Sequence, residues 1–157
     1  MRVFILTLIV FFCVISGKSH GGVTDRIKIN NYNLTITSNG NGCLLDYNGR
    51  STGTIRLIPK PPCYFLRRDK GGPVKKFSYP DVKINAVIII AGTPITDEVR
   101  KDYRLPPDTV CGSEAQGILF SKTGIRLSRA EILYGGVACR DSGVDEKDFW
   151  HFAHHEK

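Results

Sequence analysis

From residue 25 onward, apolar and polar residues alternate in short runs that are separated by turn residues. In the runs 25–30 (DRIKIN) and 32–37 (YNLTIT), Ile or Leu recurs at every second position, which is the period of a strand with one buried face. The Asn and Gly residues of the stretch 38–42 (SNGNG) tolerate the positive φ angles of tight hairpin turns. The same alternation over residues 53–58 (GTIRLI) predicts a further strand of this kind.

The most apolar stretch beyond the N-terminal region is residues 83–91 (KINAVIIIA), which is rich in β-branched side chains. This composition predicts a central strand that is buried on both faces. Pro80 and the Gly-Thr-Pro sequence at residues 92–94 bound the stretch closely, which disfavours a buried helix. Further strand-like patterns occupy the segments 43–47, 63–66, 117–121, 124–128 and 131–134.

Two short segments carry helical signals. Thr96 can cap a helix over residues 97–103, in which acidic residues precede basic ones as the helix dipole favours. A second helix is expected after Ser142, because Ser142 and Asp145 resemble a capping box. Short strands, frequent turns and few helices together predict a mainly β fold: a single antiparallel β-sandwich or open barrel with one or two short helices, stabilised by disulfides.

The N-terminus has the pattern of a secretory signal peptide. Arg2 precedes the apolar run 3–15 (VFILTLIVFFCVI), and small and polar residues follow it. This run is too short for a transmembrane helix, which needs about 20 residues. We therefore predict a signal peptide over residues 1–17 and one β-rich domain over residues 18–157, with no transmembrane segment in the mature chain. An uncleaved N-terminal anchor is the alternative.

The chain contains five cysteines, of which Cys13 lies within the predicted signal peptide. Cys13 is either removed with that peptide or lipidated, although bulky residues precede it where lipoproteins have a small one. An even number of remaining cysteines in an exported chain predicts disulfides. We expect the pairs Cys43–Cys63 and Cys111–Cys139, because each closes a loop within one half of the chain. Zinc is disfavoured, since no C-x-x-C spacing occurs.

Basic and aromatic residues gather around the Gly-Gly-Pro sequence at residues 71–73. Arg and Tyr often anchor protein interfaces, and the net charge of +7 favours an acidic partner. Nucleic acid is not expected to bind, because the basic residues are scattered along the chain. The alternative is that the aromatic residues belong to the core and the charges keep an exposed loop in solution. The predicted partner-binding residues are Tyr64, Arg67, Arg68, Lys75 and Lys76.

The C-terminal run 149–155 (FWHFAHH) is unusual for its aromatic and histidine content. On a helix, His151, His154 and His155 fall on one face, where neutral imidazoles can bind zinc or copper. The run lacks the H-E-x-x-H motif of zinc enzymes. We expect instead that its aromatic residues pack on the sheet while its histidines face solvent, and metal binding stays the alternative.

The predicted mature chain, residues 18–157, carries no recognised catalytic or cofactor motif: neither G-x-S-x-G nor S-x-x-K occurs within it. The sequence GKS at residues 17–19 lacks the preceding glycine that a phosphate-binding loop requires. We therefore expect no cofactor and favour a non-enzymatic, exported binding protein, such as a periplasmic inhibitor or immunity-type protein that blocks another protein by occlusion. The alternatives are a small secreted hydrolase with an unrecognised active site and a metal-binding protein that uses the C-terminal histidines.

Overall fold

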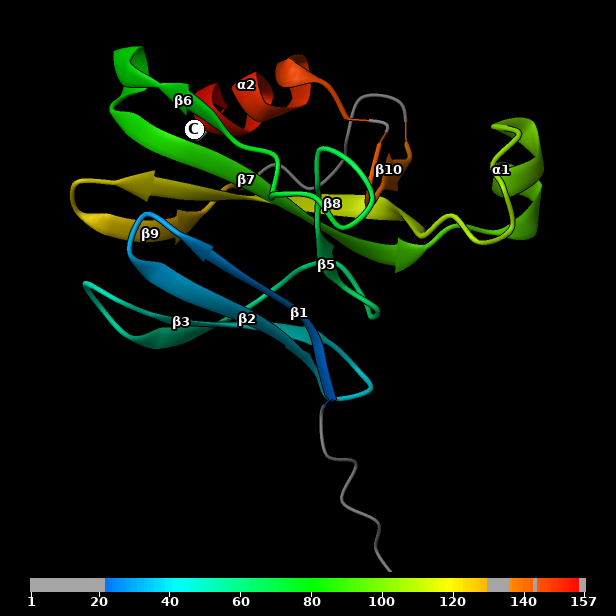
Figure 1. Cartoon of the computed structure of the whole chain (residues 1–157), viewed down its shortest axis with the longest axis horizontal. Helices are drawn as coiled ribbons and strands as arrows, with labels where there is room; N and C mark the ends of the chain where they lie inside the picture. The colour runs from blue at the N-terminus through cyan, green and yellow to red at the C-terminus, as the bar shows by residue number, and fades with distance from the viewer. Residues whose placement is uncertain (1–21, 130–135, 143, 156–157) are drawn as a thin grey trace, which may run out of the picture.

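Two antiparallel sheets face each other, and a helix covers the outer side of the second sheet (Figure 1). The computed structural model describes residues 22–129, 136–142 and 144–155. The expectation of a mainly β, antiparallel, disulfide-stabilised fold with two short helices is confirmed. The predicted signal peptide, Cys13 and the predicted strand at 131–134 lie outside the described residues.

The first sheet has the strand order β1-β2-β3-β4, so each strand pairs with its neighbour in sequence. Asn30 and Asn31 form the turn between the first two strands with φ angles of 47° and 66°, which asparagine adopts more readily than other non-glycine residues. The strands of this sheet are β1 (Gly22–Ile29), β2 (Tyr32–Ser38), β3 (Cys43–Asn48) and β4 (Gly53–Arg56).

The second sheet has the strand order β10-β8-β7-β5, with β6 also paired to β7 and β9 to β8. Gly112 of β8 lies against the backbone of Gly92 in β7, where a Cβ atom on Gly112 would come 2.0 Å from the Gly92 oxygen. The strands are β5 (Tyr64–Phe65), β6 (Phe77–Tyr79), β7 (Ile84–Pro94), β8 (Cys111–Ser121), β9 (Gly124–Leu127) and β10 (Ala138–Cys139).

Strand β7 is buried on both faces, as its β-branched sequence predicts. Ile88 and Ile90 belong to the core between the two sheets. Val87 and Ile89 point the other way and pack in the core beneath the helix that covers the second sheet. Because successive strand residues face opposite sides, a two-sided core requires apolar residues at every position, which explains the unbroken Ile run.

The helices are η1 (Pro80–Val82), α1 (Asp97–Asp102) and α2 (Glu146–His154). Thr96 caps α1 by accepting a hydrogen bond from the Val99 amide, as expected. The predicted capping box of Ser142 and Asp145 is wrong: Asp145 is the N-cap of α2 and Asp148 completes the box. Ser142 instead ends a turn in which its amide donates to the Cys139 carbonyl, so the helix begins three residues later.

The packing of α2 corrects a second expectation. Phe149 and Phe152 are fully buried against the sheet, but Trp150 is 48% exposed. The physical reason is the helical period, because Trp150 follows Phe149 by 100° around the helix axis and faces solvent.

Both predicted disulfides are present. Cys43–Cys63 joins β3 of the first sheet to the segment before β5, and Cys111–Cys139 joins β8 to β10, where the two cysteines are register partners. Such bonds are typical of oxidising compartments. In the described part of the chain, no helix has the length and apolar character needed to cross a membrane.

Candidate functional site

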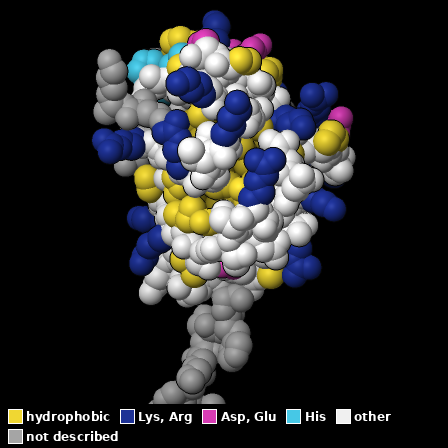
Figure 2. Space-filling view, turned by 90° about the vertical axis from the view of Figure 1, so that its left-hand side faces the viewer, with side chains coloured by type: hydrophobic (Ala, Val, Ile, Leu, Met, Phe, Trp, Pro, Cys, Tyr) yellow, Lys and Arg dark blue, Asp and Glu magenta, His cyan; other side chains and the backbone are white. Residues whose placement is uncertain are grey.

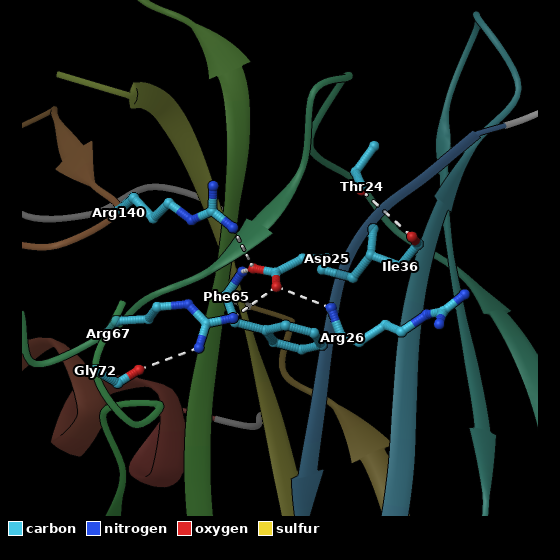
Figure 3. Close-up of polar contacts among 8 residues, drawn as sticks. All are labelled: Thr24, Asp25, Arg26, Ile36, Phe65, Arg67, Gly72 and Arg140. Carbon is cyan, nitrogen blue, oxygen red and sulfur yellow. Dashed lines mark hydrogen bonds and ion pairs between the residues drawn. The ribbon is translucent and has the colours of Figure 1, made fainter. Parts of the chain in front are cut away.

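A buried carboxylate holds the base of the predicted binding loop. Asp25 lies next to an irregularity in the pairing of β1 with β2, and its side chain is only 4% exposed. Arg67 donates to Asp25 Oδ1 at 2.6 Å and Arg140 lies 3.2 Å from Oδ2 (Figure 3). The backbone amides of Arg26 and Phe65 also donate to this carboxylate, at 2.8 and 3.0 Å. We call Asp25, Arg67 and Arg140 the Asp25 network.

The Asp25 network carries an excess positive charge, since two guanidinium groups share one carboxylate. A buried carboxylate is costly unless charged partners and hydrogen bonds compensate for its lost hydration, and here all four contacts do so. The network spans β1 of the first sheet, the start of the loop after β5 and the turn after β10 (Figure 3). It therefore fixes three distant parts of the chain at one point.

Residues 67–76, which we call the basic loop, form a compact turn next to this network. The Arg67 amide donates to the Arg140 carbonyl at 2.7 Å, and the Arg67 guanidinium donates to the Gly72 carbonyl at 3.1 Å. Arg67 and Val74 form an antiparallel bridge, and Gly71 adopts a φ of 74° at the tip. Backbone hydrogen bonds and the Arg67 side chain together set the shape of the basic loop.

Three cations of the basic loop reach solvent. Arg68, Lys70 and Lys76 are exposed. Lys75, in contrast, is half-buried and its ammonium group donates to the Val144 carbonyl, which ties the loop to the segment before α2. The predicted cations therefore divide into two that hold the loop, Arg67 and Lys75, and others that face outward.

A cleft of about 720 Å³ opens beside the basic loop. Arg67, Lys70 and Arg140 line it together with two carboxylates, Asp108 and Asp141. The lining carries both signs of charge, with three cations against two carboxylates. Such a cleft suits the charged side chains of a protein surface better than an apolar small molecule.

Tyr64 does not lie on this surface. It is 3% exposed, and its hydroxyl donates to the Ala138 carbonyl at 2.9 Å. Burial raises the pKa of the Tyr64 phenol above its usual value. A partner cannot reach this side chain in the folded protein, so Tyr64 belongs to the core and we leave it out of the proposed contact.

Sequence reasoning missed Asp25, Lys70 and Arg140. Lys70 stands inside the predicted loop and could have been included from its position alone. Asp25 and Arg140 are 115 residues apart in a sequence that gives no sign of their pairing, which depends on the packing of the two sheets. The basic loop itself lies where the cluster of cations and glycines predicted it.

The three histidines of α2 are not equivalent. His154 Nε2 lies 2.8 Å from Asp81 Oδ2 of η1, and its Nδ1 lies 2.8 Å from the Trp150 carbonyl. The expectation that all three face solvent is wrong for His154, whose side chain is 14% exposed. The His151 and His155 rings stack on each other with centroids 4.1 Å apart.

Among the described residues, no group of three His, Cys, Asp or Glu side chains is placed to hold a metal ion. Metal binding by the histidines stays a prediction.

The contact between Asp81 and His154 makes part of the stability depend on pH. Its hydrogen bond raises the pKa of His154 and lowers that of Asp81. The raised histidine pKa stabilises the fold fully below the ordinary value of 6.5, and this contribution is lost as pH rises through the folded pKa. The lowered carboxyl pKa stabilises the fold above 3.8 and is lost as pH falls through the folded pKa. The contact is therefore strongest between these two values.

We expect Asp81→Asn to lower the melting temperature more at about pH 5.5 than at about pH 8.5, because only the protonated histidine gains from the carboxylate. Thermal unfolding monitored by circular dichroism at both pH values measures the difference. Asp102→Asn, on the exposed face of α1, is the matched control and should show no such dependence. An equal loss at both pH values for Asp81→Asn would contradict the assignment.

No protein-family model, curated protein or solved structure matches this chain. The candidate site is therefore defined by its own geometry: a basic loop fixed at its base and a charged cleft beside it.

Proposed function

We propose that this protein is an exported, non-enzymatic binding protein that blocks an acidic surface of another protein by occlusion, in the manner of an inhibitor or immunity protein. The observation that carries the proposal is that the cations of the basic loop have two different roles. Arg67 and Lys75 hold the loop to the body of the protein, while Arg68, Lys70 and Lys76 extend into solvent.

A loop with this construction loses little freedom when it binds. Ordering flexible segments on association costs free energy, and a loop whose backbone is already hydrogen-bonded avoids most of that cost. Its exposed cations attract an acidic partner over a distance of about 10 Å at moderate salt and accelerate encounter. The adjacent cleft, with both signs of charge, offers paired contacts once the partner has docked.

Two features support export. The N-terminal run has the pattern of a secretory signal peptide, and both disulfides need an oxidising compartment to persist. The partner is then expected in the same compartment, which in a bacterium is the periplasm.

Affinity capture from a native envelope extract tests this function. The oxidised protein should retain one stoichiometric partner, and the triple variant Arg68→Glu, Lys70→Glu, Lys76→Glu should retain at least about tenfold less. The matched control, Lys28→Glu, Arg50→Glu, Lys60→Glu, makes the same change in net charge at exposed positions outside the loop and should bind like the original protein.

The captured partner is then purified and its affinity measured by calorimetry at increasing salt. We expect the dissociation constant to rise with salt, because exposed charges dominate the contact. Equal capture by the loop variant and the control, or no partner for a folded protein, would refute the proposed function.

A further inference from the structure

A second hollow, of about 580 Å³, lies at one end of the second sheet and shares no residue with the basic loop or its cleft. We call it the η1 pocket, because η1 and the start of β7 form one wall and the β8–β9 turn forms the other. Figure 2 faces this end of the molecule and shows Lys and Arg side chains around an exposed apolar area, with acidic side chains near the margins.

The cations of the η1 pocket are Lys83, Lys122 and Arg126, and all three are exposed. Among the described residues that line the pocket, none is Asp or Glu. This distinguishes it from the cleft beside the basic loop, where two carboxylates offset part of the charge. Three like charges around a concave surface create a positive potential that concentrates anions.

Backbone geometry places these cations around the pocket. Lys83 ends η1 in the left-handed conformation, with a φ of 61°, and its amide donates to the Pro80 carbonyl at 3.0 Å. Lys122 and Arg126 flank Gly124, whose φ of 128° suits glycine and closes the β8–β9 turn. The pocket is therefore held between a capped 3-10 turn and a tight hairpin.

Part of the remaining wall is apolar. Pro80, Val82 and Ile84 contribute to it, beside the uncharged polar residues Asn85, Ser121 and Thr123. A simple inorganic ion would leave this wall uncovered. The ligand that satisfies both parts of the pocket combines a strongly charged anion with an apolar body.

We propose that the η1 pocket binds an organic phosphate, with the phosphate group between Lys83, Lys122 and Arg126 and the apolar body against Pro80 and Val82. A phosphate dianion matches three cations better than a carboxylate does, and a guanidinium group binds phosphate oxygens in a bidentate manner. This site is independent of the protein partner proposed above, since neither its residues nor its ligand are shared.

The test is an NMR titration of the oxidised, ¹⁵N-labelled protein with phenyl phosphate, which joins a phosphate group to an apolar ring. We expect saturable shifts concentrated at residues 80–85 and 121–126, with a dissociation constant of about 1 mM or lower. Inorganic phosphate should bind about tenfold more weakly, because it does not cover the apolar wall.

Lys122→Glu combined with Arg126→Glu should weaken phenyl phosphate binding by about tenfold or more. Lys28→Glu combined with Arg50→Glu changes net charge equally outside the pocket and should leave binding unchanged. Lys83→Gln serves as a second variant, which removes one charge without introducing repulsion and should weaken binding severalfold. The spectrum of each variant reports directly whether it has kept its fold.

A parallel arm identifies the source of the phosphate, using phosphatidylcholine vesicles with and without phosphatidic acid. Retention on the acidic vesicles that the Lys122 and Arg126 double variant loses would assign a lipid headgroup. Phenyl phosphate binding without retention would assign a free organic phosphate. Shifts spread over the whole surface, equal affinity for inorganic phosphate, or binding that survives the double substitution would overturn the proposal.

Discussion

Replacement of Asp25 by asparagine is expected to lower the free energy of unfolding by about 3 kcal/mol. The substitution keeps the size of the side chain but removes the charge that two guanidinium groups share. Arg67 and Arg140 then face each other across a neutral group. The loss lies at the lower end of the range for buried pairs, because both arginine side chains keep some contact with water.

Urea unfolding of the oxidised protein measures this loss. Asp46→Asn is the matched control, since Asp46 lies on the same sheet but accepts an exposed hydrogen bond from Thr54. Its effect should stay below about 1 kcal/mol. A comparably small effect of Asp25→Asn would show that the network does not stabilise the fold.

The same substitution also separates stability from binding. Under conditions where Asp25→Asn remains folded, we expect weaker capture of the protein partner, because Arg67 no longer anchors the base of the basic loop. Unchanged capture by the folded variant would mean that the hydrogen bonds of the loop backbone suffice to hold its shape.

Replacement of Phe149 by alanine is expected to cost about 3–5 kcal/mol. Phe149 is 0% exposed, and its ring lies 4.8 Å from that of Phe77. Truncation leaves a cavity between α2 and the second sheet. This cavity can close only in part, because β7 and β8 on its far side are held in the sheet. Helix α2 contributes Phe149, Phe152 and Ala153 to the core on this side of the second sheet, so we expect the substitution to destabilise this whole core.

Trp150 provides the matched control for this prediction, as a neighbouring aromatic residue on the same helix. It is largely exposed and stacks on His154 with ring centroids 4.3 Å apart. We expect Trp150→Ala to cost less than about 1 kcal/mol. Urea unfolding of both variants measures the loss in the free energy of unfolding, and equal losses would contradict the packing described for α2.

Much of the fold could be predicted because local patterns determine it. The two-residue period of the first strands, the unbroken apolar run of β7 and the turn chemistry of Asn30 and Asn31 each act over a few residues. The two disulfide pairs followed from the spacing of the cysteines. The start of α2 was misplaced because two candidate N-caps stand three residues apart, and the turn after β10 engages Ser142 first.

The candidate site was predictable only in part. Glycines and cations gave the position of the basic loop, but they did not distinguish anchoring residues from exposed ones. Tyr64 was misjudged because β5 is covered on both faces, so that Tyr64 and Phe65 are both buried in a strand with no exposed side. Asp25 was missed because its partners come from segments that only the packed sheets bring together.

The close approach of Gly112 to Gly92 limits how this sequence can change over evolution. Even the smallest side chain at residue 112 would force β7 and β8 apart, next to a cysteine whose disulfide fixes the same strand to β10. Side chains that fit at other positions of β8 are therefore excluded at residue 112. A distant descendant of this fold would be expected to keep the Cys-Gly pair of residues 111 and 112 after most of its surface has diverged.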